Sequence, residues 1–115
     1  MENTRLSENV ILVKLGLGDS KVSEELKRLN KNLNQNKDCD VVLDFTYVEI
    51  INSSNISNLM ILRGLLEDQG RKLVLLNVQS ITKCIFVVAG LSNFFNFVEN
   101  LEDVKKTLQK ETCTK

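Results

Sequence analysis

Short apolar runs alternate along this chain with longer stretches in which apolar residues recur every three or four positions. The runs predict strands at residues 9–15, 41–46, 73–76 and 94–98. In the second run, Val-Val-Leu-Asp-Phe-Thr, apolar residues are nearly continuous rather than alternating with polar ones. This pattern is typical of a strand that helices cover on both faces, so we expect it to lie at the middle of a sheet.

Periodic apolar positions predict two helices before residue 70. Ser20 can cap the first helix, and the polar segment 34–38 ends it. The second helix begins at two adjacent serines, Ser53 and Ser54, which are typical helix caps, and it ends near Gly70. The apolar faces of these helices are Val22, Leu26, Leu29 and Leu33 on the first and Ile56, Leu59, Met60, Leu62, Leu65 and Leu66 on the second.

The last third of the chain predicts two more helices. The third helix stops at Gly90, and Asn100 opens the fourth, which has acidic residues in its first turn and lysines toward its end. The three phenylalanines between these helices are expected to pack in the core. The residues concerned are Ile81, Cys84, Ile85, Val88 and Ala89 on one face of the third helix, Leu101, Val104 and Leu108 on the fourth, and Phe94, Phe95 and Phe97 between them.

Strands that alternate with helices imply an α/β fold. We expect a mixed β-sheet of four to five strands packed with about four α-helices. The length of 115 residues fits a single domain, 1–115, with a core of about 8–110 and a tail at 111–115. The chain contains no proline, and no linker-like or repeated segment interrupts it.

Composition narrows the function mainly by exclusion. Lys+Arg and Asp+Glu balance at 15 each, so no basic surface for nucleic acid is expected. The longest apolar run is far shorter than the roughly 18 residues that span a bilayer, so we expect no membrane insertion. Cys39, Cys84 and Cys113 form no CxxC pair, which indicates reduced thiols and a cytoplasmic location.

Motifs for catalysis are incomplete, and we predict that the protein is not an enzyme and needs no cofactor. The chain has no histidine, so Ser53 and Ser54 lack the usual base. Gly16-Leu17-Gly18 has Lys21 where a dinucleotide-binding loop has its third glycine. Gly64 and Gly70 are one residue too far apart for a Walker loop.

Carboxylates near the central strand do not suggest a metal site. Asp40, Asp44 and Glu49 do not match the spacing of a calcium loop, and Asp44 falls within a predicted strand. They are better explained as solvated groups or as residues of strand-end turns. We therefore expect no catalytic residue and no metal ligand.

The order of several short motifs resembles the STAS domain family, whose founding members are bacterial anti-sigma factor antagonists. The family has an apolar strand ending in Asp-Ser-Ser-Gly, then a Gly-x-x-Leu strand entry and a Gly-Leu-x-x-x-Phe turn. The matching segments are the strand 41–45 leading to Ile-Asn-Ser-Ser-Asn-Ile at 51–56, Gly-Arg-Lys-Leu-Val-Leu at 70–75, and Ala-Gly-Leu-Ser-Asn-Phe-Phe at 89–95.

The resemblance implies a switch in bacterial transcription regulation. In the antagonist branch of the family, the second serine of Asp-Ser-Ser-Gly is phosphorylated by a partner that is both anti-sigma factor and kinase, and only the unphosphorylated antagonist binds it. Ser54 matches that serine, and Ser53 and Ser57 are alternative acceptors. A phosphate adds about −1.5 to −2 charges, which a helix N-terminus tolerates while a partner surface does not.

The chain departs from the family motif at Asn52, where relatives have aspartate, and at Asn55, where they have glycine. The expected partner-binding residues are Asn52, Ser53, Ser54, Asn55 and Asn58. The predicted partner is an anti-sigma factor or related serine protein kinase, with weak self-association as a further expectation. The departures favour an alternative function, a STAS interaction or scaffold module in a stress-signalling assembly that is not phosphorylated.

Overall fold

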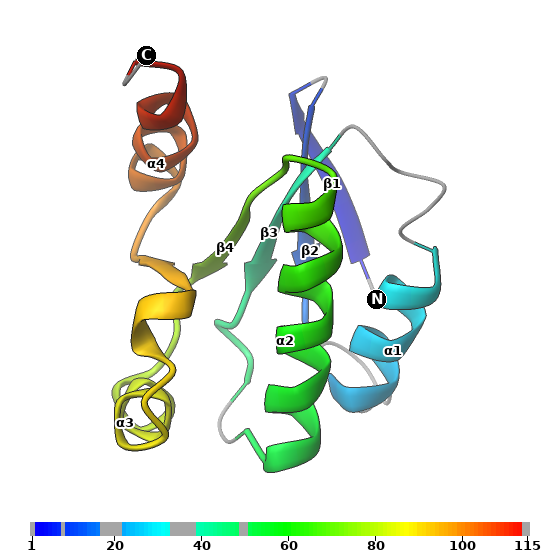
Figure 1. Cartoon of the computed structure of the whole chain (residues 1–115), viewed down its shortest axis with the longest axis vertical. Coiled ribbons are helices and arrows are strands. Elements are labelled where there is room, and N and C mark those ends of the chain that lie inside the picture. The colour runs from blue at the N-terminus through cyan, green and yellow to red at the C-terminus, as the bar shows by residue number, and fades with distance from the viewer. Residues whose placement is uncertain (1, 8, 17–21, 33–38, 49–50, 114–115) are drawn as a thin grey trace.

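The computed structural model describes residues 2–7, 9–16, 22–32, 39–48 and 51–113 (Figure 1). Its five strands are β1 (Glu2–Ser7), β2 (Val10–Lys14), β3 (Asp40–Asp44), β4 (Leu73–Leu76) and β5 (Asn96–Val98). Its α-helices are α1 (Val22–Asn32), α2 (Ser53–Asp68), α3 (Ser80–Val88) and α4 (Leu101–Cys113), and the 3-10 turn η2 is Ser92–Phe94. The predicted α/β fold with a mixed sheet is thereby confirmed.

The sheet has the strand order β1-β2-β3-β4-β5. β1 pairs with β2 in the antiparallel direction, and every other neighbouring pair is parallel. Because β3 lies between β2 and β4, the prediction of a central strand at 41–46 is confirmed. The register places Val41 beside Ile11 on one side and beside Leu73 on the other.

Alternation along the strands divides the core into two layers. Ile11 and Val13 of β2 face the same cluster as the apolar residues of α1 and α2 and Phe86 of α3. Leu12, between them, faces the other cluster, which Val104 of α4 completes. Both faces of the parallel strands are therefore covered, as continuous apolar strands require.

Glycines end α2 and α3 in the same way. Gly70 and Gly90 both have positive φ, +71° and +74°, which a residue without a side chain adopts easily. After α2, the N–H of Arg71 donates to the carbonyl of Leu66 at 2.8 Å; after α3, Leu91 makes the equivalent bond to Phe86. These are the bonds of a Schellman motif, so the predicted helix ends are confirmed.

The structure corrects several details of the predicted elements. β1 was not predicted, because it is a polar edge strand without an apolar run. β5 begins at Asn96 rather than at Phe94, which lies in η2 and is 44% exposed instead of in the core. α4 extends to Cys113, into the predicted tail. The cap at Ser20 lies outside the described residues.

Helix lengths and compositions also bear on the membrane prediction. Within the part of the chain that the structure describes, no helix combines the length and the apolar character needed to span a bilayer.

Candidate functional site

The two predicted switch serines lie at the edge of the sheet where the parallel strands end. β3 ends at Asp44, a short turn follows, and α2 starts at Ser53 (Figure 1). In open α/β sheets, ligands and partners commonly meet this carboxyl edge, because loops and helix N-termini gather there. The position is therefore suited to recognition rather than to holding the core together.

Asn52 caps α2. Its backbone is extended, with φ −110° and ψ 176°, and its side-chain Oδ1 accepts a hydrogen bond from the N–H of Asn55 at 2.9 Å. Its carbonyl accepts the first helical bond, from the N–H of Ile56 at 3.0 Å. The prediction that Ser53 and Ser54 cap the helix is wrong, because both are already helical residues. Their hydroxyls are therefore not needed as the cap.

A stripe of exposed side chains runs along the first two turns of α2. Ser53, Ser54 and Ser57 are exposed, and exposed Ile61 follows at helical spacing. We call these four residues the switch face. The three candidate acceptor hydroxyls and one large apolar side chain thus lie where a partner protein could touch them together.

The switch face carries no charge of its own. From Ser53 to Leu62 the chain has no charged residue, and the first turn of α2 has no acidic one. The first charge on the helix is Arg63, which pairs with Glu67 one turn further on at 2.9 Å. A phosphate on Ser54 would therefore introduce about −1.5 to −2 charges into a neutral surface, at a helix end that favours negative charge.

Asn55 and Asn58 do not belong to the exposed surface. They are 5% and 8% exposed, whereas Asn52, Ser53 and Ser54 are exposed, so a role of Asn55 and Asn58 in partner binding stays a prediction. The two residues are three positions apart, so both lie on the same, inward side of the helix. The carbonyl of Asn58 accepts a hydrogen bond from the side chain of Asn30 of α1 at 3.2 Å. In this chain the position of the family glycine is therefore filled by an inward-facing amide.

A small polar network lies at the carboxyl edge of the sheet. Asp44 Oδ1 accepts hydrogen bonds from the backbone N–H and the hydroxyl of Thr46. The side-chain amide of Asn77, in the loop after β4, donates to that hydroxyl at 3.2 Å. The sequence predicts a solvated group or a strand-end turn at Asp44, and the structure has the turn; the contact with Asn77 was not predicted. It links the ends of β3 and β4.

Gly16 marks a close approach at the same edge. Its φ is +80°, and a Cβ at this position would lie 2.9 Å from the carbonyl oxygen of Tyr47. Its N–H donates to Glu25 Oε1 at 3.0 Å, and the Glu25 side chain is buried. Glycine at position 16 is therefore a packing requirement; Leu17 and Gly18 lie outside the described residues.

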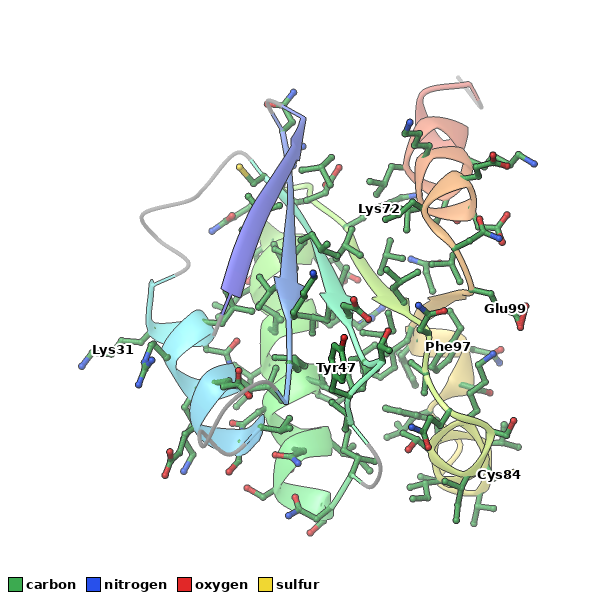
Figure 2. All side chains as sticks on the ribbon, turned by 180° about the vertical axis from the view of Figure 1, so that it is seen from behind. Lys31, Tyr47, Lys72, Cys84, Phe97 and Glu99 are labelled. Carbon is green, nitrogen blue, oxygen red and sulfur yellow. The ribbon has the colours of Figure 1, made fainter. Side chains whose placement is uncertain are left out.

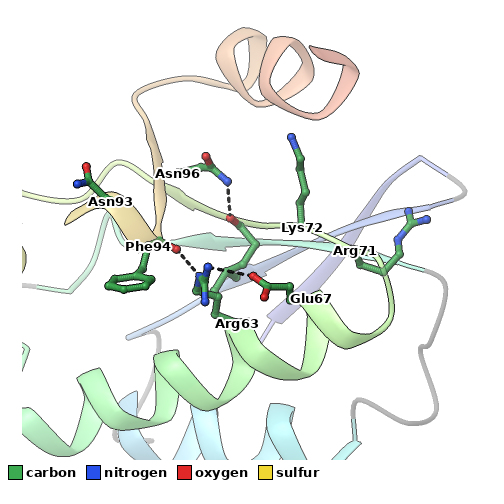
Figure 3. A pocket seen from close by; sticks show the side chains of 8 residues that line it. Arg63, Glu67, Arg71, Lys72, Asn93, Phe94 and Asn96 are labelled. Carbon is green, nitrogen blue, oxygen red and sulfur yellow. Dashed lines mark hydrogen bonds and ion pairs between the residues drawn. The ribbon is translucent and has the colours of Figure 1, made fainter. Parts of the chain in front are cut away.

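A polar hollow of about 280 Å³ lies near the other end of α2 (Figure 3). Arg63 Nε donates to the carbonyl of Phe94 at 2.6 Å, and Arg71 pairs with Asp40 at 3.1 Å. Lys72 donates to the carbonyl of Thr107 at 3.2 Å. These cations are therefore engaged within the protein: Arg63 joins α2 to η2, and Lys72, just before β4, joins that strand to α4.

The carboxylates considered as metal ligands are not assembled into a site. Asp44 is buried and bonded to Thr46, while Asp40 pairs with Arg71 and accepts from the N–H of Lys72. Glu49 lies outside the described residues. Among the residues that are described, no group of three or more potential ligands is close enough to hold a metal ion.

Comparison with known sequences defines the class of this protein. The sequence model of the STAS domain matches residues 18–104, and the chain therefore belongs to the STAS domain family. The predicted resemblance is thus confirmed. No curated protein matches the chain.

Solved structures show the same fold. SpoIIAA from Bacillus in its phosphorylated form is 14% identical, with a TM-score of 0.68 over 92% of this chain and 97% of that chain. A serine-to-glutamate variant of RsbS from Moorella thermoacetica is 14% identical, with a TM-score of 0.77 over 98% and 97%. A chain of the stressosome, a signal integration and transduction hub, is 18% identical, with a TM-score of 0.72 over 96% and 98%.

The family match and these likenesses confirm the STAS domain and its fold. Regulation by phosphate and the identity of a partner depend on side chains, and at 11–18% identity most side chains of these structures differ from those of this chain. The switch face of this chain must therefore be argued on its own geometry.

Proposed function

We propose that this chain is an anti-sigma factor antagonist-like regulator that acts in the cytoplasm without catalysis of its own. Its switch face binds an anti-sigma factor or a related serine kinase, and phosphorylation of Ser54 prevents that binding. The observation that supports this proposal most directly is the position of Ser54. It is exposed on an uncharged surface at a helix N-terminus, and its hydroxyl is not required as the cap.

The same observation means that a phosphate on Ser54 can weaken partner binding without destabilising the fold. A phosphate at the first turn of α2 interacts favourably with the helix dipole, by about 0.3–1 kcal/mol. The partner, in contrast, would have to dock against a new dianion beside Ile61, which is apolar. A loss of about 2.7 kcal/mol in binding is a hundredfold loss of affinity, which is enough for a switch.

The solved forms of one protein of similar fold support the proposal. SpoIIAA, an anti-sigma factor antagonist, has been solved in phosphorylated and unphosphorylated forms, so a chain of this fold can carry a phosphate. In the present chain, Asn52 replaces the family aspartate but still provides the capping acceptor. The helix cap next to Ser54 is therefore present in this chain without a carboxylate.

The experiment starts from the tagged chain recovered from its own cells, with mapping of phosphoserine and of copurifying proteins. The expected result is a kinase-related partner and a phosphate on Ser54. Ser54→Asp should then weaken binding of that purified partner by a hundredfold or more, while Ser54→Ala should bind normally and accept no phosphate. Normal binding by Ser54→Asp, with no phosphate at Ser53, Ser54 or Ser57, would refute the switch.

Ser80 offers a matched control. It is the exposed first residue of α3, so Ser80→Asp adds the same charge at the start of another helix. We expect this variant to bind the partner within about threefold of the unmodified protein. Both aspartate variants should melt at or above the temperature of the parent chain, because each places a negative charge at a helix N-terminus.

A second candidate function is a scaffold module that binds without a phosphate switch. It is favoured by the exposed apolar side chain of Ile61, which could anchor a partner whatever the state of Ser54. If Ile61→Asp abolishes partner binding while Ser54→Asp leaves it unchanged, the scaffold function is the correct one.

A further inference from the structure

The side chain of Asn58 carries a buried hydrogen-bond donor that nothing in the described part of the chain accepts. The residue is 8% exposed, and its Nδ2 has no hydrogen-bond partner there. A buried amide without a partner costs free energy, whereas an apolar residue of the same shape would not. The unmodified chain thus keeps an unpaired donor one helical turn after the proposed phosphoacceptor, Ser54.

Helix geometry places this donor next to Ser54. With about 100° of rotation per residue, Asn58 lies about 40° around α2 from Ser54, and residues at this spacing have Cβ atoms about 5–6 Å apart. Ser54 is the member of the switch face closest to the buried side of α2, and Asn58 is the buried residue closest to the switch face. Side chains of a helix lean toward its N-terminus, so that of Asn58 covers the turn that contains Ser54.

The other two candidate acceptors do not have such a neighbour. Four residues after Ser53 comes Ser57, and four residues after Ser57 comes Ile61. Around the helix, Asn58 lies about 140° from Ser53 and about 100° from Ser57, too far for a short amide side chain. Asn58 therefore distinguishes Ser54 from both alternatives.

The contact between α1 and α2 holds Asn58 in place. Asn30 of α1 donates from its Nδ2 to the carbonyl of Asn58 at 3.2 Å. Lys27 and Lys31 of α1 are exposed, and Figure 2 shows Lys31 extending away from the molecule. The buried donor beside Ser54 is therefore a neutral amide.

We propose that Asn58 Nδ2 donates a hydrogen bond to the phosphate of phosphorylated Ser54. This inference rests on the proposed phosphorylation of Ser54 and specifies how the modified side chain is held. A phosphate brings three strong acceptor oxygens, and a hydrogen bond to a charged group is stronger than one between neutral groups. The bond pairs the buried donor and fixes the phosphate beside the contact between α1 and α2. Of the three candidate serines, only Ser54 gains it.

Phosphoserine encoded in place of Ser54 in the full chain tests the inference without a kinase. In protein labelled with nitrogen-15, the side-chain amide protons of Asn58 should shift downfield when position 54 carries the phosphate. Asn58→Leu should remove this signal and thereby assign it. Phosphoserine in place of Ser57 is the matched control, and it should leave the Asn58 signal where it is.

Thermal melts measure the same bond. Unmodified Asn58→Leu should melt at or above the parent chain, because it removes an unpaired buried amide. Phosphate at position 54 should raise the melting temperature of the parent by about 4 °C more than that of Asn58→Leu. Asn58→Ala, which adds no bulk, should lack the extra rise as well. Phosphate at position 57 should change parent and variants equally.

The possible results separate this inference from its competitors. An unmoved Asn58 signal, with equal melting shifts in the parent and Asn58→Leu, would overturn it, and Asn55 Oδ1, which also has no partner among the described residues, would be the acceptor. A rise that Lys27→Gln abolishes and Asn58→Leu retains would overturn it in favour of the lysine. The proposed function fails separately, if Ser54 carries no phosphate in the cell, because the encoded phosphoserine tests Asn58 in either case.

Discussion

Replacing Asn52 by alanine removes the side chain that caps α2 while leaving the rest of the site in place. The lost interaction is the 2.9 Å hydrogen bond from the N–H of Asn55 to Asn52 Oδ1. Asn52 is exposed, so the change removes little buried surface. Loss of an N-cap of this kind costs about 1 kcal/mol, within a range of about 0.5–2. For a domain of this size, that lowers the melting temperature by about 4 °C.

Asn52→Asp is the informative companion variant, because it restores the residue of the family motif. A carboxylate keeps an acceptor for the N–H of Asn55 and adds a negative charge to a first turn that has none. The gain expected from the helix dipole is about 0.3–1 kcal/mol at low salt. The predicted order of stability is therefore Asp at or above Asn, and Asn above Ala.

Urea denaturation followed by circular dichroism measures this order, with thermal melts at low and high salt as a second readout. The advantage of Asn52→Asp over the parent should shrink as salt is added, whereas the deficit of Asn52→Ala should not. If Asn52→Ala were as stable as the parent chain, the capping role would be refuted. If aspartate were less stable than alanine, the favourable electrostatics assigned to this helix end would be wrong.

Two further predictions concern packing. Gly16→Ala should destabilise the fold by about 2 kcal/mol or more in urea denaturation, because the added methyl group meets a carbonyl at 2.9 Å and φ is +80°. Gly64→Ala, inside α2 with open space around it, should instead stabilise the fold by about 0.5–1 kcal/mol. Equal effects of the two substitutions would contradict this reasoning. Phe86→Ala should lower the free energy of unfolding by about 3–5 kcal/mol, because it leaves a cavity in the core. Phe94→Ala should lower it by about 1 kcal/mol or less, because Phe94 is exposed and its ring centre lies 5.0 Å from the Arg63 guanidinium. Comparable losses in the two variants would refute the assigned burial.

Sequence reasoning located the serines that we predict to be the switch, but it did not predict their surroundings. Ser54 could be located because the apolar strand before it and the motifs after it occur in a fixed order along the chain. Asn55 and Asn58 were assigned to the partner surface because polar residues near a helix start are usually exposed. Only the packing of α1 against α2 shows that both are buried, since burial depends on a neighbour distant in the sequence.

The sequence by itself determined the features that depend on local periodicity and backbone preference. The nearly continuous apolar run of β3 indicated a central strand, and Gly70 and Gly90 marked the ends of α2 and α3. In these cases a short stretch of chain contains the whole physical cause. The position of a strand in a sheet and the stop of a helix could therefore be predicted without knowing the fold.

The tertiary structure decided which side of each element faces inward. β1 exists only because β2 offers it a pairing edge, since its own residues are mostly polar. In α3 both sides are apolar, and the packing of Phe86 against Phe95 selects the side that is buried, leaving Val88 in solvent. Periodicity defines a face, but contacts between segments far apart in the sequence determine what that face meets.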